Sequence, residues 1–196
     1  MYNPSYFNLP SFSSFRVLNI PVSCDDFYAT SKYILILVNN TIKIYSHSEC
    51  SNIRLYKVIR HNLLLFINKK CMMNILYKIL LSNMKNIEDI ILYLKVDEIR
   101  KVVEMEHGFL VTYKNREKIF YDCNLEIQEK TNSKPVDILK INTIIKNKDK
   151  IIQIKRDEII IGEKTVECKK ILKLVGEGNY IFIRNKDIIK ALIFTQ

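Results

Sequence analysis

The sequence predicts a mainly β protein with a hairpin-rich body, one or two short helices and an extended N-terminal arm. Short runs rich in Ile, Val, Tyr and Phe recur along the chain, and these residues are good strand formers. Turn signals separate the runs by about 8–12 residues, as in all-β folds. Only residues 1–23 and 71–95 depart from this pattern. We therefore expect an arm at 1–23 and a single β-rich domain at 24–196 with a helical insert at 71–95.

The arm holds three of the four prolines and a single charged residue. Proline is poorly tolerated in helix interiors and central strands, so we expect no regular structure here. Exposed aromatic rings are a liability unless a surface covers them, and that surface belongs either to the protein's own body or to a partner. We expect the arm to leave the body and fill a partner's cavity. Its expected anchors are Tyr2, Tyr6, Phe7, Phe12, Phe15 and Arg16.

The body is predicted to consist mostly of β-hairpins, each an apolar run, a polar turn and a second apolar run. The turns contain Asn and Lys instead of Gly. Asn tolerates the left-handed backbone, which suits tight hairpins in a chain with four glycines. The predicted turns centre on Asn40, Asn115, Arg156 and Arg184–Lys186, and a fifth hairpin is predicted over Leu63–Ile67 and Cys71 onward.

Apolar residues at helical spacing predict the insert. A helix capped by Ser82 or Asn83 would run to about Lys95, with acidic residues in its first turns. A shorter helix over Cys71–Leu81 is the alternative to the fifth hairpin. The expected apolar stripe is Met84, Ile87, Ile91 and Leu94.

The stretch from Cys50 to Ile87 contains seven basic residues and no Asp or Glu, in a chain of formal net charge +10. A surface of one sign suits a polyanion such as RNA. The alternative is a solvated face whose acids lie elsewhere in the sequence but near in space. Aromatic residues among the cations (Tyr56, Phe66 and Tyr77) would either stack on bases or face the core. The predicted RNA-binding residues are Arg54, Lys57, Arg60, Lys69, Lys70, Lys78 and Lys85.

The sequence offers little for catalysis. His47, His61 and His107 are isolated, and motifs for catalytic metals, nucleotides or acyl substrates are missing. Five widely spaced cysteines without a C-x-x-C pair predict reduced, buried thiols instead of a disulfide framework or zinc site. There is neither a secretory signal nor a membrane-spanning apolar run. We therefore expect a cytoplasmic, non-catalytic protein with no cofactor, metal, small-molecule substrate or membrane contact.

The hairpins recur in units of about 30–45 residues, which is the spacing of four-stranded propeller blades. Residues 16–49 and 96–194 resemble degenerate WD-repeat-type blades, although the chain has no Trp. This resemblance implies a propeller-like body. An irregular β-barrel or sandwich would show the same hairpin spacing.

The compact basic β body, the aromatic arm and a composition rich in Ile, Asn and Lys together resemble a microsporidian ribosome dormancy (hibernation) factor. The resemblance implies a non-catalytic protein that binds the ribosome, both rRNA and ribosomal proteins, and occludes functional sites of inactive ribosomes. The alternative function is a β-propeller-like protein-interaction scaffold in a cytosolic complex. Salt distinguishes the two, because RNA binding weakens steeply with salt and an apolar protein interface does not.

Overall fold

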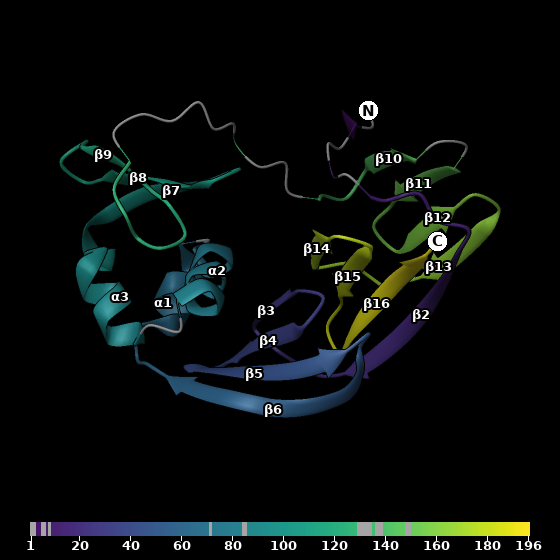
Figure 1. The fold of residues 1–196 in the computed structure, drawn as a ribbon, viewed down its shortest axis with the longest axis horizontal. Helices are drawn as coiled ribbons and strands as arrows, with labels where there is room; N and C mark the ends of the chain where they lie inside the picture. Colours follow the sequence, from purple (N-terminus) through teal and green to yellow (C-terminus); the bar gives the residue numbers. More distant parts are fainter. Residues whose placement is uncertain are drawn as a thin grey trace. The chain divides into compact units, whose positions relative to one another are not determined.

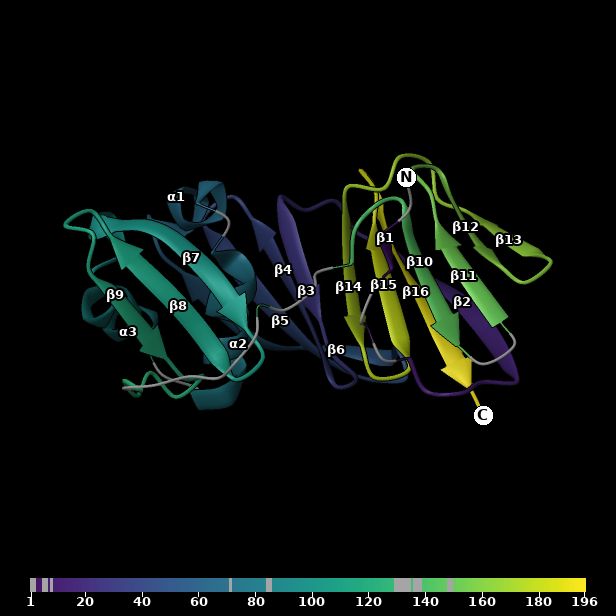
Figure 2. The ribbon, with the colours of Figure 1, turned by 90° about the horizontal axis from the view of Figure 1, so that it is seen from above.

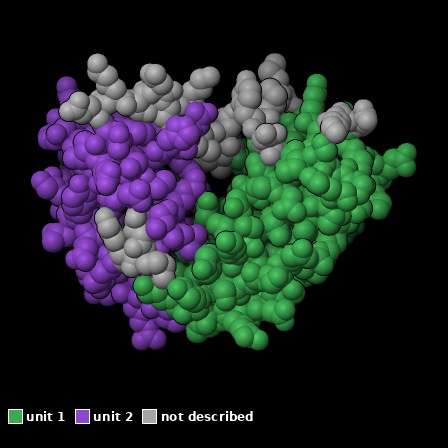
Figure 3. Space-filling view, viewed as in Figure 1, with its two compact units in different colours: residues 1–38, 43–57, 137–196 green, residues 39–42, 58–136 purple. Residues whose placement is uncertain are grey.

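The computed structural model describes residues 3–4, 7, 9–70, 72–83, 86–128, 135, 139–147 and 150–196. These residues form sixteen strands, three α-helices and one 3-10 helix, which confirms the mainly β prediction (Figure 1). They divide into two compact units, coloured separately in Figure 3. Unit 1 comprises residues 1–38, 43–57 and 137–196, and unit 2 comprises residues 39–42 and 58–136. The expected single domain at 24–196 therefore contributes to both units.

Unit 1 contains two sheets that share one apolar core (Figure 2). One sheet has the order β1-β10-β11-β12-β13, in which β1 is parallel to β10 and the other pairs are antiparallel. The second is antiparallel, with the order β14-β15-β16-β2. The predicted turns at Arg156 and Arg184–Lys186 are confirmed. The strands are β1 Asn3–Pro4, β2 Ser14–Pro21, β10 Thr143–Asn147, β11 Lys150–Ile154, β12 Glu158–Ile161, β13 Lys164–Glu167, β14 Lys173–Glu177, β15 Tyr180–Arg184 and β16 Ile188–Thr195.

Alternation explains why these segments are strands with one buried face. In β11 and β12, buried Ile152, Ile154, Ile159 and Ile161 alternate with more exposed residues. This period of two places all four side chains on one face of the sheet. The β15 strand is buried along most of its length, as a central strand covered on both faces should be. The core of unit 1 thus follows directly from the Ile-rich composition.

The expected arm is part of unit 1, and this corrects the expectation that it leaves the body. Strand β2 pairs antiparallel with β16 over eight residues, from Ser14 opposite Thr195 to Pro21 opposite Ile188. Leu9 and Phe12, before the strand, are buried in the core. Proline did not prevent this because Pro21 ends the strand and β2 is the outer strand of its sheet, where a missing N–H is tolerated.

A third sheet has the order β3-β4-β5-β6, and its first two strands are antiparallel. Its strands are β3 Asp26–Ala29, β4 Tyr33–Val38, β5 Thr41–Ser48 and β6 Ser51–Arg60. The predicted turn at Asn39-Asn40 is confirmed, and Asn39 adopts the left-handed backbone with a φ of 54°. This sheet and the β10-β11-β12-β13 part of the first sheet are each built from four strands that are consecutive in the sequence.

Unit 2 combines the helices with an antiparallel sheet of order β7-β8-β9. The predicted turn at Asn115 is confirmed between β8 and β9. The fifth hairpin is wrong, because Leu64 and Ile67 lie three residues apart on the buried face of a helix. The elements are α1 Leu64–Lys69, α2 Met73–Asn83, α3 Ile87–Tyr93, the 3-10 helix Val96–Glu98, β7 Ile99–Met105, β8 Gly108–Tyr113 and β9 Lys118–Tyr121.

The helical insert at 71–95 is confirmed, but its predicted cap is wrong. Ser82 and Asn83 end α2, and α3 starts after Asn86. In α3 the buried residues are Ile87 and Ile90, followed by Leu94 just beyond its end. Of the other two residues of the expected stripe, Ile91 is half-buried and Met84 lies outside the described residues. None of the helices among the described residues is long and apolar enough to cross a membrane.

Candidate nucleic-acid interface

The structure distributes the predicted RNA-binding residues over both units. Arg54 and Lys57 lie on the part of β6 that belongs to unit 1. Arg60 ends the same strand in unit 2, where Lys69 and Lys70 end α1 and Lys78 lies on α2. Lys85, Tyr2 and Tyr6 lie outside the described residues. The acid-free stretch therefore supplies charge to two separate sets of elements.

The cations of this stretch differ in what they contact. Lys78 forms an ion pair with Glu104 of β7, so an acid distant in sequence neutralises it, as the solvated-face alternative expected. The Lys70 ammonium donates to the Ile99 carbonyl at 2.6 Å. It also lies 4.7 Å from the centroid of the Phe66 ring. By contrast, no carboxylate among the described residues forms an ion pair with Arg54, Lys57, Arg60 or Lys69.

Arg60 lines an open depression of about 370 Å³ in unit 2, together with Asn40, Thr41, His61, Asn62 and Glu88. Hydrogen bonds fix its floor. The His61 N–H donates to the Asn40 carbonyl at 3.1 Å, and the Leu65 N–H donates to Asn40 Oδ1 at 3.2 Å.

The His61 ring has a defined role in this depression. Its Nδ1 accepts from the Leu63 N–H at 3.1 Å, which leaves Nε2 to carry the proton in the neutral tautomer. The depression therefore presents hydrogen-bond donors of the kind that phosphate oxygens accept from, beside the Glu88 carboxylate.

The three aromatic residues of the acid-free stretch differ in their exposure to solvent. Tyr77 is fully buried, so the core interpretation is right for it. Tyr56 is 53% exposed on β6, with its ring centroid 5.7 Å from that of Tyr33. Phe66 is 39% exposed on α1, beside the Lys70 ammonium. Two of the three rings are thus accessible to a partner.

The expected arm anchors lie in or near the core of unit 1. Phe12 packs edge-on against Phe194, with ring centroids 4.6 Å apart. Phe15 is half-buried against the same ring, and Phe7 packs on the core cluster. Arg16 forms an ion pair with Glu49 at 2.5 Å. The described anchors therefore hold unit 1 together and do not project into a partner's cavity.

Sequence reasoning missed a second depression, of about 560 Å³, between the β11–β12 turn and the connection from β13 to β14 in unit 1. Its lining carries three cations and three carboxylates, so its formal charge is balanced. One acid pairs internally, since Lys155 and Glu158 form an ion pair at 2.6 Å. A second carboxylate is hydrogen-bonded to the backbone, since Asp157 Oδ1 accepts from the Lys170 N–H at 2.7 Å. The lining residues are Lys155, Arg156, Asp157, Glu158, Glu167 and Lys169.

The described side chains provide little nucleophilic chemistry. Burial raises the pKa of the Cys24, Cys50, Cys123 and Cys168 thiols, that of Cys50 to about 11. They are consequently protonated at neutral pH, and the thiolate is the reactive form. Within the described residues, no three His, Cys, Asp or Glu side chains gather in a way that could hold a metal ion.

No family model and no curated protein matches this chain. Solved structures similar to it include a catalytically inactive virginiamycin B lyase from Staphylococcus aureus bound to quinupristin, with 10% identity and a TM-score of 0.20. Another is Hsv2 from Kluyveromyces lactis, with 8% identity and a TM-score of 0.19. They match 84% and 86% of this chain, which spans 50% and 42% of theirs. Likenesses at these TM-scores carry no argument.

Proposed function

We propose that this chain is a non-catalytic, cytoplasmic RNA-binding protein that associates with rRNA and ribosomal proteins of inactive ribosomes and occludes their functional sites. One observation carries the RNA part: Arg60 and Lys69, two cations of the acid-free stretch in unit 2, form no ion pair with a carboxylate among the described residues. Unneutralised cations attract a polyanion and release its counterions on binding.

Arg60 and Lys69 are the first phosphate-binding residues in this proposal. Both side chains are exposed in unit 2, and Arg60 lines the depression that also contains His61 and Asn62. Phe66, three residues before Lys69 and partly exposed, offers a ring on which an unpaired base can stack. The ribosome as the source of RNA rests on the resemblance to dormancy factors. The occluding part would be the folded body, because the described arm residues are needed within it.

The test is a charge reversal with a matched control. Arg60→Glu with Lys69→Glu removes two cations that lack acidic partners, whereas Arg156→Glu with Lys169→Glu makes the same charge change at the balanced depression. Binding to purified ribosomes and to an rRNA fragment is measured by sedimentation and fluorescence anisotropy across a salt series. Each lost phosphate contact lowers the salt slope by about one unit, so the first variant loses about two.

In the control variant, the slope should change by less than half as much. An equal loss of slope in both variants would show that only net charge matters and would remove the site assignment. An unchanged slope in the first variant would remove the RNA proposal itself and leave the protein-interaction scaffold.

A further inference from the structure

Strand β6 is uncovered in a way that the RNA proposal does not explain. It is the last strand of the order β3-β4-β5-β6, so no described segment pairs with its outer edge (Figure 1). Ser51 to Tyr56, all in unit 1, are exposed at six consecutive positions. Among them Ile53, Leu55 and Tyr56 expose 40%, 56% and 53% of their surface. Both faces and one edge of the strand are therefore open.

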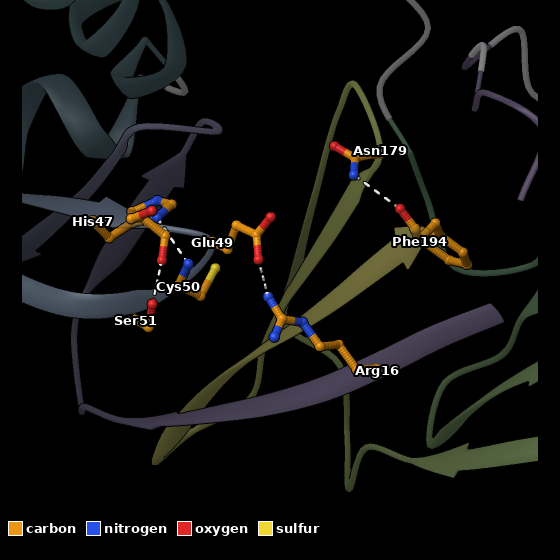
Figure 4. Close-up of polar contacts among 8 residues, drawn as sticks. Arg16, His47, Glu49, Cys50, Ser51, Asn179 and Phe194 are labelled. Carbon is orange, nitrogen blue, oxygen red and sulfur yellow. Dashed lines mark hydrogen bonds and ion pairs between the residues drawn. The ribbon is translucent and has the colours of Figure 1, made fainter. Parts of the chain in front are cut away.

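The start of β6 is held rigidly, so the open edge is organised before any partner binds. Left-handed Glu49 and Cys50 form the turn from β5. The Cys50 N–H donates to His47 Nδ1 at 3.0 Å, and the Ser51 hydroxyl donates to the Ser48 carbonyl at 2.5 Å (Figure 4).

Two more contacts tie this turn to the rest of unit 1. His47 Nε2 lies 3.0 Å from the Thr30 carbonyl and, with Nδ1 accepting, is the nitrogen that donates. Arg16 of β2 pairs with Glu49. A partner that docks on β6 would thus pay little ordering entropy at this end of the strand.

The chemistry of the edge identifies its occupant. An open strand edge presents alternating N–H and C=O groups, which the backbone of another extended polypeptide satisfies and a phosphodiester backbone does not. Residues alternate between faces, so Ile53 and Leu55 share one face, and Arg54 and Tyr56 share the other. Lys57 lies on the face of Leu55. Each face therefore combines apolar surface with one cation, and no acid occurs between Ser51 and Lys57.

We propose that residues 53–57 of β6, which follow left-handed Asn52 (φ 51°), bind an extended acidic segment of a protein partner by strand addition. Arg54 and Lys57 are three residues apart and on opposite faces, so the partner segment carries two acidic residues three apart, with apolar residues between them. This assigns Arg54 and Lys57 to a protein in place of RNA. A second copy of the chain is disfavoured, because two paired β6 strands would bring like charges together.

The probe is a fluorescein-labelled peptide of about seven residues, with Glu at its second and fifth positions and valine or tyrosine between them. It should bind the full chain with a Kd below about 1 mM. A control peptide with Lys at both positions should bind at least about tenfold more weakly, and Arg54→Glu with Lys57→Glu should reverse that preference. Leu55→Ser should weaken binding about tenfold. Leu172→Ser, at an apolar side chain of unit 1 that is 47% exposed, should not change it.

Two N-methylated versions of the probe test the pairing itself. A strand donates to its neighbour through every second N–H, so methylating one alternate set should abolish binding and methylating the other should preserve it. Equal binding of the two versions would overturn strand addition, as would the absence of binding at about 1 mM probe. Displacement of the probe by an RNA oligonucleotide would instead assign β6 to RNA. None of these results depends on Arg60 or Lys69, so this proposal and the proposed function can fail separately.

Discussion

Replacing Phe12 with Ala should destabilise unit 1 strongly, although Phe12 is only the twelfth residue of the chain. Its side chain is 9% exposed and lies in the core cluster. The ring meets Phe194 at an interplanar angle of 61°, and the Lys150 ammonium lies 4.5 Å from the ring centroid. Lys150 also donates to the Phe12 carbonyl at 3.1 Å.

The expected loss follows from these contacts. A buried Phe→Ala change costs about 3–5 kcal/mol, and we take about 3 kcal/mol because Phe12 keeps 9% of its surface exposed. One kcal/mol shifts the melting temperature by about 2–4 °C in a chain of this length, so the expected shift is about 6–12 °C. Thermal unfolding followed by circular dichroism measures it.

Phe66→Ala is the matched control for this substitution. Its ring is 39% exposed on α1, so the same change in side-chain volume should shift the melting temperature by less than about 2 °C. If Phe12→Ala left the melting temperature unchanged but weakened ribosome binding, the packing argument would be refuted. The original expectation of a partner-binding arm would then be right.

Three further predictions test other parts of the structure. Burial lowers the pKa of His47 below its unfolded value, so its contribution to stability should be present above about pH 6.5 and lost as the pH falls through the folded pKa. His47→Gln should reduce this loss of stability at acid pH, as measured by urea unfolding at a series of pH values. An unchanged pH profile would contradict this prediction. Asp26→Asn should cost about 3 kcal/mol in urea unfolding, because the half-buried ammonium of Lys173, which contacts the carboxylate at 2.9 and 3.0 Å, loses its ion-pair partner. A loss below about 1 kcal/mol would show that water reaches the ammonium. Gly108→Ala should lower the free energy of unfolding by at least about 3 kcal/mol, since its Cβ would lie 2.1 Å from a backbone carbonyl oxygen. Gly178→Ala, at a position with a φ of 56° and open space around it, should lower it by only about 1–2 kcal/mol. Equal losses of stability in the two variants would argue against the steric cause.

Local features of the fold could be predicted from the sequence, and non-local ones could not. The turns at Asn40 and Asn115 depend on a few neighbouring residues, so turn chemistry and alternation sufficed. The position of β2 depends on its pairing with β16 at the other end of the chain, and nothing near Ser14 indicates that partner. The α1 helix was missed because its short apolar run fits either a strand or a helix.

The sequence predicts the sign of the charge at the candidate site but not which side chains surround each cation. The absence of acids between Cys50 and Ile87 predicts a basic surface, and Arg60 and Lys69 of this stretch form no ion pair among the described residues. It did not indicate that Lys78 would meet Glu104, because that acid approaches from a different strand. The depression around Arg60 also includes Glu88, which follows it by 28 positions in the sequence. Such neighbours follow from tertiary packing, which the linear pattern of charges does not encode.

The pairing of β2 with β16 has a consequence for how the protein is made. Ser14 and Thr195, which are hydrogen-bonded at 2.7 Å, are 181 positions apart in the chain. At about 5–20 residues per second, translation leaves β2 without its partner for on the order of 10–40 s. Residues 58–136 of unit 2 are synthesised before residues 137–196, the last of the three segments of unit 1. Unit 2 can therefore fold on the ribosome before β16 is synthesised. During this time the apolar side chains that precede β2 remain exposed and accessible to chaperones.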